Sequence, residues 1–165
     1  LYIGEDVERT AKHGDMAQKM QLHKQLKNVG GTVLWYAKAA VDNVGNYGTM
    51  LRQNYWRTKA LQPRMDFIDG DAPKAVRKVK VVEMADGPFI FWKKPKGKGW
   101  RNEAVKYAIY CFRQGEPIDI SNASHLVATT TNNFVRIGAQ RAMNTYVITA
   151  LDRMDNESEG RQVVY

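Results

Sequence analysis

The feature that most constrains the fold is a series of short strand-like segments that begins near residue 75. Turn residues separate the segments, and their spacing predicts strands near 75–84, 87–93, 104–113, 125–130, 133–137, 144–152 and 161–165. In the third segment a period of two places Tyr107, Ile109 and Cys111 on one face. Seven short segments of this kind, without a helical period, predict an antiparallel β-sandwich.

Two aromatic residues are the expected anchors of this sandwich. Trp92 lies in the second segment and Tyr146 in the sixth, and each has a large apolar surface to bury between two sheets. Cys111 is the only cysteine, so an internal disulfide and a cysteine-built metal site are excluded. We interpret it as a small core residue, because a nucleophilic cysteine needs an adjacent base that the pattern does not supply.

The first 65 residues follow a different pattern, in which apolar runs alternate with helical segments. Leu1–Ile3 is a short strand-like run, and Asp15 can cap a helix that continues to about Asn28. Thr32–Tyr36 is β-branched and aromatic, which is typical of a buried strand. A second helix is expected over Met50–Leu61, because Pro63 then ends it. This order predicts two βα units with parallel strands, which are too few to close a sheet.

Several segments of the second part resemble, in their order, a fibronectin type III domain. They are Phe89–Pro95, Lys106–Tyr110, and Tyr146–Asp152 followed by Asn156-Glu157-Ser158. The first part resembles the end of a glycosyl-hydrolase-like family related to family-ten glycoside hydrolases. That resemblance is carried by Gly31–Trp35, the helix around Leu51–Tyr55, and Ala60–Met65.

Together the resemblances imply a mixed fold for the C-terminal part of a longer protein. Residues 1–65 would be a βαβα remnant of a (β/α)8 (TIM) barrel, with Leu1–Gly4 as its seventh strand and Thr32–Trp35 as its eighth. Residues 66–74 would be a linker, and residues 75–165 a fibronectin type III-like sandwich of about seven strands. Members of this family are largely secreted bacterial proteins, which implies a secreted, periplasmic or cell-surface location. The parent enzyme would hydrolyse O-glycosyl bonds of a polysaccharide or cell-wall glycan.

Functional residues of a barrel enzyme lie at the carboxyl ends of its strands. The resemblance therefore places Glu5 and Asp6 at a cleft after strand seven, and Trp35, Tyr36 and Asp42 at the same cleft after strand eight. For Glu5 and Asp6 a solvated loop is the simpler interpretation. Trp35 is either a platform that stacks on sugar or a residue of the barrel wall. We assign no catalytic residue, because the family's principal acid and base are expected on earlier strands.

The densest basic cluster follows the second predicted strand of the sandwich. It consists of Lys93, Lys94, Lys96, Lys98 and Arg101 around Trp100, in a chain of formal net charge +8. A basic patch with an aromatic residue can bind phosphates, but a solvated hairpin loop is the simpler interpretation. No helix-turn-helix, zinc-knuckle or RNP pattern accompanies it, so nucleic acid is the least favoured partner. Exposed aromatic residues such as Trp100 can also contact carbohydrate weakly.

Neither a metal nor a cofactor is expected. His13, His23 and His125 do not have the spacing of a metal site, and no glycine-rich phosphate loop is present. No apolar run is long enough to cross a membrane. The missing barrel strands would leave apolar edges at Leu1–Ile3 and Val33–Trp35, so we expect this part to self-associate or to pack on the sandwich.

Three functions from different classes are compatible with these patterns. The first is the C-terminal part of a secreted glycoside hydrolase, inactive by itself, whose sandwich is an accessory module that acts as a spacer, packs against another domain or binds carbohydrate weakly. The second is a protein-interaction sandwich, and the third is a basic nucleic-acid-binding module.

Overall fold

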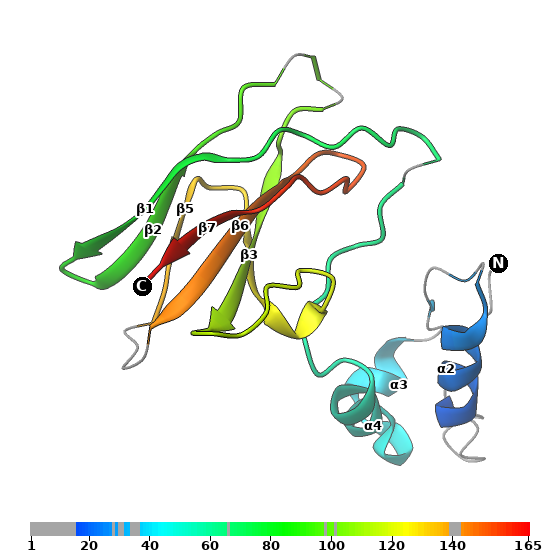
Figure 1. Ribbon diagram of the computed structural model, residues 1–165. Helices are drawn as coiled ribbons and strands as arrows, with labels where there is room; N and C mark the ends of the chain where they lie inside the picture. Colours follow the sequence, from blue (N-terminus) through cyan, green and yellow to red (C-terminus); the bar gives the residue numbers. More distant parts are fainter. Residues whose placement is uncertain are drawn as a thin grey trace. The chain divides into compact units, whose positions relative to one another are not determined.

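The computed structural model describes residues 16–27, 29, 32–33, 37–65, 67–97, 99–100, 102–138 and 143–165 (Figure 1). The chain divides into two compact units, Leu1–Arg57 and Thr58–Tyr165. We call them the helical unit and the sandwich unit.

The helical unit contains three α-helices in its described residues: α2 (Met16–Gln25), α3 (Ala37–Val41) and α4 (Tyr47–Asn54), with the 3-10 turn η1 (Val44–Asn46) before α4. A small apolar cluster holds them together and consists of Met20, Ala39, Tyr47 and Leu51. Helices α3 and α4 approach so closely at Gly48 that a Cβ atom there would lie 2.2 Å from the carbonyl oxygen of Ala40. Glycine is therefore required at this crossing.

The structure confirms one of the helices and strands predicted for residues 1–65, contradicts others and does not describe the rest. Helix α2 confirms a helix within the predicted range 15–28. The prediction that the second helix reaches Leu61 is wrong, because α4 ends at Asn54 and Leu61 packs instead on an apolar cluster of the sandwich unit. Thr32 and Val33 are not in a strand, and Leu34–Tyr36 and Leu1–Ile3 lie outside the described residues. The barrel remnant therefore stays a prediction.

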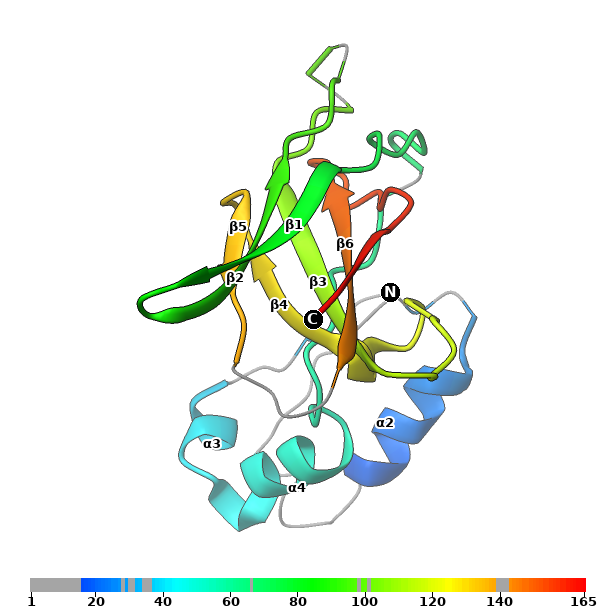
Figure 2. The ribbon, with the colours of Figure 1, turned by 60° about the vertical axis from the view of Figure 1, so that its left-hand side comes forward.

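The sandwich unit confirms the predicted class and the expectation of about seven strands. They are β1 (Arg77–Met84), β2 (Gly87–Lys93), β3 (Lys106–Arg113), β4 (Leu126–Thr130), β5 (Phe134–Arg136), β6 (Asn144–Leu151) and β7 (Arg161–Val164). They form a three-stranded sheet, in the order β1-β2-β5, and a four-stranded sheet, in the order β4-β3-β6-β7. Every pairing is antiparallel, and Figure 2 shows the strands of both sheets from a second direction.

The inner core between the two sheets contains both predicted anchors. Trp92 and Tyr146 are buried there, and the ring of Trp92 meets the ring of Tyr107 edge to face at 5.2 Å between centroids. Cys111 is half-buried against the same core, as the period of two in β3 predicts. The alternation of side chains along a strand thus correctly identifies the face that packs between the sheets.

The opposite face of the four-stranded sheet is buried as well. A second cluster on this face consists of Ala108, Tyr110, Phe112, Leu126, Val147 and Leu151. Leu61, from the segment that precedes the sandwich, and Ile120, from the β3–β4 connection, pack against it. Both segments therefore cover the outer face of this sheet.

Polar contacts hold the preceding segment on the β6–β7 connection. The backbone N–H of Met65 donates to the carbonyl oxygen of Met154 at 2.8 Å, and the Asn156 side chain donates to the Asp69 carbonyl oxygen at 2.6 Å. Asp152 shapes the connection by accepting hydrogen bonds from the backbone N–H groups of Met154 and Asn156 at 2.8 and 3.0 Å. The Asp-Arg-Met-Asp-Asn turn thus fixes the chain that leads into the sandwich.

Truncation of Trp92 should strongly destabilise the sandwich unit. We expect Trp92→Ala to lower the free energy of unfolding by about 3–5 kcal/mol, because it removes the largest ring of the inner core. Trp100→Ala is the matched control, since Trp100 is 61% exposed and its loss should cost less than about 0.5 kcal/mol. Urea unfolding followed by circular dichroism measures both. Equal destabilisation by the two variants would contradict the assignment of Trp92 to the core.

Stability should fall in alkali, partly through Tyr146. Burial, and secondarily the nearby Cys111, raises the pKa of the Tyr146 phenol to about 12. Between the ordinary pKa of about 10 and this value, the unfolded chain loses a proton that the native state keeps, so stability decreases as the pH rises. Urea unfolding at about pH 9 and about pH 11 should show a smaller decrease for Tyr146→Phe than for the parent chain. An identical decrease in both would refute this role for Tyr146.

Candidate functional site

Most residues predicted at a barrel cleft lie outside the described part of the chain. These are Glu5, Asp6, Trp35 and Tyr36. Their placement at a cleft therefore stays a prediction.

Asp42 is described, directly follows α3 and forms an ion pair with Lys38, the second residue of that helix. Both side chains are largely exposed, and pairs of this kind contribute little to stability. Among the described residues of the helical unit, Asp42 is the only acidic one. A glycosidase usually needs two carboxylates that flank the scissile bond, so Asp42 alone does not make such a site.

The basic cluster after β2 is only partly described, because Lys98 and Arg101 lie outside the described residues. Lys94 forms an ion pair with Glu103 at 2.7 Å, and its hydrogen bond to this carboxylate raises the pKa of the ammonium group. Trp100 lies on this connection with 61% of its surface exposed. The ion pair with Glu103 thus neutralises the charge of Lys94, and the Trp100 side chain is largely exposed to solvent.

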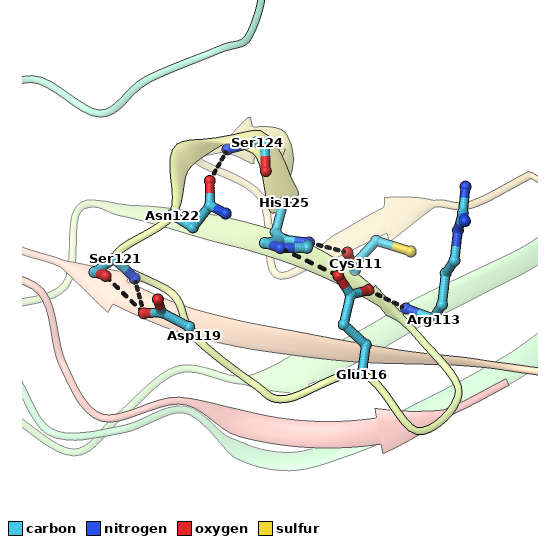
Figure 3. Close-up of polar contacts among 8 residues, drawn as sticks. All are labelled: Cys111, Arg113, Glu116, Asp119, Ser121, Asn122, Ser124 and His125. Carbon is cyan, nitrogen blue, oxygen red and sulfur yellow. Dashed lines mark hydrogen bonds and ion pairs between the residues drawn. The ribbon is translucent and has the colours of Figure 1, made fainter.

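A polar network lies on the connection between β3 and β4 (Figure 3). The Glu116 carboxylate accepts a hydrogen bond from the backbone N–H of Arg113 at 2.9 Å and lies 3.5 Å from Nε2 of His125. Asp119 accepts from both the backbone N–H and the hydroxyl of Ser121, at 3.0 and 2.6 Å. Each carboxylate thus binds the backbone within three residues of itself. These contacts hold the β3–β4 connection in the conformation that covers the outer face of β3.

The pair of His125 and Cys111 does not make a nucleophilic centre. Nδ1 of His125 lies 3.2 Å from the backbone carbonyl oxygen of Cys111. Figure 3 shows that the Cys111 sulfur points away from the His125 ring. Burial raises the pKa of the Cys111 thiol, whereas a reactive thiolate needs a lowered one. The His125 ring stacks on Phe112 at 4.4 Å between centroids, so it also packs against the sheet. Among the described residues no cluster of three or more His, Cys, Asp or Glu could hold a metal ion.

A different candidate site lies on the outward face of the three-stranded sheet. Three phenylalanine side chains gather there, with ring centroids 5.7 to 6.3 Å apart: Phe89, Phe91 and Phe134. Phe134 is 41% exposed, and the other two are half-buried. We call this surface the aromatic face.

Strand register explains why these rings meet. In β2, Ile90 and Trp92 point into the inner core, so the alternate residues Phe89 and Phe91 must point outward. Phe91 pairs with Phe134 of β5, and residues directly opposite each other in an antiparallel pair lie on the same face. The three rings therefore form one continuous surface across two strands.

Sequence reasoning missed this face. The alternation of Phe89 and Phe91 with Ile90 and Trp92 is visible in the sequence, and it would have placed the two phenylalanines outward once Trp92 was assigned to the core. The third ring comes from the pairing of β2 with β5, which no local pattern reveals.

A concave surface of about 530 Å³ borders the aromatic face. Its lining contains three lysines, three apolar side chains, Trp92 and a single amide: Lys78, Lys80, Lys93, Val82, Met84, Phe91, Trp92 and Asn133. None of these lining residues is acidic. The surface thus combines apolar contact area with positive charge.

Comparison with known proteins finds a similarity to a glycosyl hydrolase. The chain is similar to glycosyl hydrolase YngK of Bacillus subtilis (strain 168), with 25% identity over 170 residues. The alignment covers 96% of this chain and 33% of that protein, so the chain spans about a third of its relative. No family model matches the chain.

Two solved structures are similar to part of this chain. One is an Fn3-like protein from Clostridium thermocellum, with a TM-score of 0.42 and 18% identity, covering 57% of this chain and 92% of that chain. The other is the glycoside hydrolase domain of Endo-D from Streptococcus pneumoniae R6, with a TM-score of 0.41 and 13% identity, covering 59% of this chain and 15% of that chain. The assignment of the β-sandwich rests on the strand pairing itself.

Cys111 should behave as a core thiol. We expect iodoacetamide to label it much more slowly in the native chain than in the urea-unfolded chain near neutral pH, because burial raises the thiol pKa and restricts access. Mass spectrometry of timed samples measures both rates. Native labelling as fast as that of the unfolded chain would overturn this description of the thiol.

Proposed function

We propose that this chain is a non-catalytic accessory part of a glycoside hydrolase, and that its fibronectin type III-like sandwich contacts carbohydrate through the aromatic face. The observation that carries the proposal is the outward grouping of Phe89, Phe91 and Phe134 on one sheet. The similarity to a glycosyl hydrolase over 96% of the chain supports the enzyme class of the parent protein.

The chemistry of an aromatic ring fits the apolar face of a sugar. The face of the ring carries partial negative charge, which attracts the C–H groups that project from a pyranose. Neighbouring rings on a rigid sheet hold this surface in place before binding, so that little conformational entropy is lost. Exposed aromatic groups of this kind are otherwise avoided on a soluble surface, because they expose apolar area to water.

The predictions for residues 1–65 belong to the same proposal. These residues would form the last two βα units of the parent's barrel, with residues 66–74 as the linker, and Glu5, Asp6, Trp35, Tyr36 and Asp42 would lie at its cleft. Trp100 would add a weak carbohydrate contact on the sandwich.

The parent protein would act on a polysaccharide or cell-wall glycan outside the bacterial cell. No described helix is long and apolar enough to cross a membrane. Self-association through exposed barrel edges also stays a prediction.

Carbohydrate binding should depend on Phe91. We expect the chain to bind at least one member of a panel of peptidoglycan, plant and host glycans in calorimetry, and Phe91→Ala to weaken that binding about fivefold to tenfold. This range corresponds to the loss of about 1.0–1.4 kcal/mol of ring contact. Phe67→Ala is the matched control, because Phe67 is 83% exposed and lies outside both sheets.

Folding is checked in parallel by circular dichroism, and Phe134→Ala provides a second variant on the same face. If no glycan binds saturably, or if Phe67→Ala weakens binding as much as Phe91→Ala, the proposed carbohydrate role is wrong. A spacer or domain-packing role would then describe the module.

A further inference from the structure

We propose that the aromatic face binds an acidic polysaccharide, one whose sugar rings carry carboxylates. This inference rests on the proposed function and adds the chemical class of the ligand. It follows from where the structure places positive charge relative to the three phenylalanine rings.

Two rows of side chains cross the outward face, and each row ends in a cation. In the first row, Lys80 of β1 lies opposite Phe91, which lies opposite Phe134 of β5. In the second row, Val82 of β1 lies opposite Phe89, which lies opposite Arg136 of β5. Since residues opposite each other share a face, the rings have a lysine at one edge and an arginine at the other.

Two further lysines lie beside the first row. Lys93 is exposed at the end of β2, and Lys78 lies at a register shift in β1 with a backbone φ of 52°. Both line the concave surface together with Lys80 and Phe91. A bulge of this kind re-aims a side chain relative to the regular strand. Lys78 thereby joins Lys80 and Lys93 around one depression.

The positive charge of this face is not neutralised within the described part of the chain. None of the four cations Lys78, Lys80, Lys93 and Arg136 forms an ion pair with another described residue. The nearby Glu83 carboxylate accepts a hydrogen bond from the Tyr165 hydroxyl at 2.6 Å, and its position in β1 alternates with the outward residues Val82 and Met84. The aromatic face therefore has unbalanced positive charge.

A carboxylated sugar satisfies both components of this surface. Its ring C–H groups can contact the phenylalanines, while its carboxylate reaches the cations at the edges. Arg136 can bind a carboxylate with two parallel hydrogen bonds, and the lysines act as mobile point charges. A neutral sugar would contact the same rings but would leave the cations without a counter-charge. The face should therefore discriminate in favour of acidic chains.

The test compares an oligogalacturonate with its fully methyl-esterified form, which has the same sugar rings but no charge. At low salt we expect the 165-residue chain to bind the acidic oligomer about tenfold or more tightly than the ester. This difference should shrink with added salt, because screening weakens exposed charge pairs. The double substitution Lys80→Gln/Arg136→Gln should reduce affinity for the acidic oligomer toward that of the ester. Phe91→Ala should weaken the binding of both oligomers by a similar factor.

A matched control removes the same charge elsewhere. Lys27→Gln/Arg52→Gln changes two exposed cations of the helical unit and should leave the preference for the acidic oligomer intact. Equal affinity for acid and ester, with binding still dependent on Phe91, would overturn the inference and leave the proposed function standing. Loss of preference in the control variant would likewise overturn it.

Two other results distinguish a failure of the proposed carbohydrate binding from a failure of the preference for acidic sugars. If neither oligomer binds, and the wider glycan panel also shows no binding that depends on Phe91, the proposed function fails and the inference fails with it. If a single-stranded DNA oligonucleotide binds more tightly than the acidic oligomer, with the same dependence on Phe91, Lys80 and Arg136, the ligand is a nucleic acid and the inference is wrong.

Discussion

Burial of both faces of the central strand β3 is the constraint on which the rest of the sandwich unit depends. One face contributes Tyr107 and Ile109 to the inner core, and the other contributes Tyr110 and Phe112 to the outer cluster. A strand that is apolar on both faces needs two coverings, and the second sheet supplies only one. The segment that contains Leu61 and the β3–β4 connection supply the other. The polar networks around Asp152 and Glu116 are explained by this need, because they fix the two covering segments.

The three-stranded sheet has the opposite arrangement. Its inward residues Ile90 and Trp92 are buried, yet its outward residues are aromatic, aliphatic and cationic instead of the small polar groups typical of a solvated sheet face. An exposed ring is costly in water and contributes nothing to the core. Both faces of the four-stranded sheet are covered, whereas the outward face of the three-stranded sheet is not. This difference identifies the aromatic face as the candidate binding surface, and no catalytic residue is needed for the identification.

Much of the sandwich could be predicted because its strands are short, alternating and bounded by turn residues. Each predicted range from 75–84 to 161–165 contains one observed strand. The outer cluster could not be predicted, because Tyr107–Phe112 is apolar at every position and its alternation does not reveal that a loop covers the second face. The sequence predicts that Leu61 lies in a helix, because Leu61 is the last apolar residue before the helix breaker Pro63, whereas its actual contacts are with residues far along the chain. The aromatic face was missed for the same reason: Phe91 and Phe134 meet through strand pairing, which is not a local property.

The edges of the two sheets determine how this module can meet other molecules. β1 has a register shift at Lys78, β5 has three residues, β7 has four, and β4 has a second register shift opposite β3. Bulges and short edge strands interrupt the row of unpaired backbone groups that another strand would need for pairing. The sandwich is thus poorly suited to growing by addition of a strand from a neighbouring chain. Contacts with other molecules are therefore left to side chains on the faces of the sandwich, because its edges offer few backbone groups for pairing.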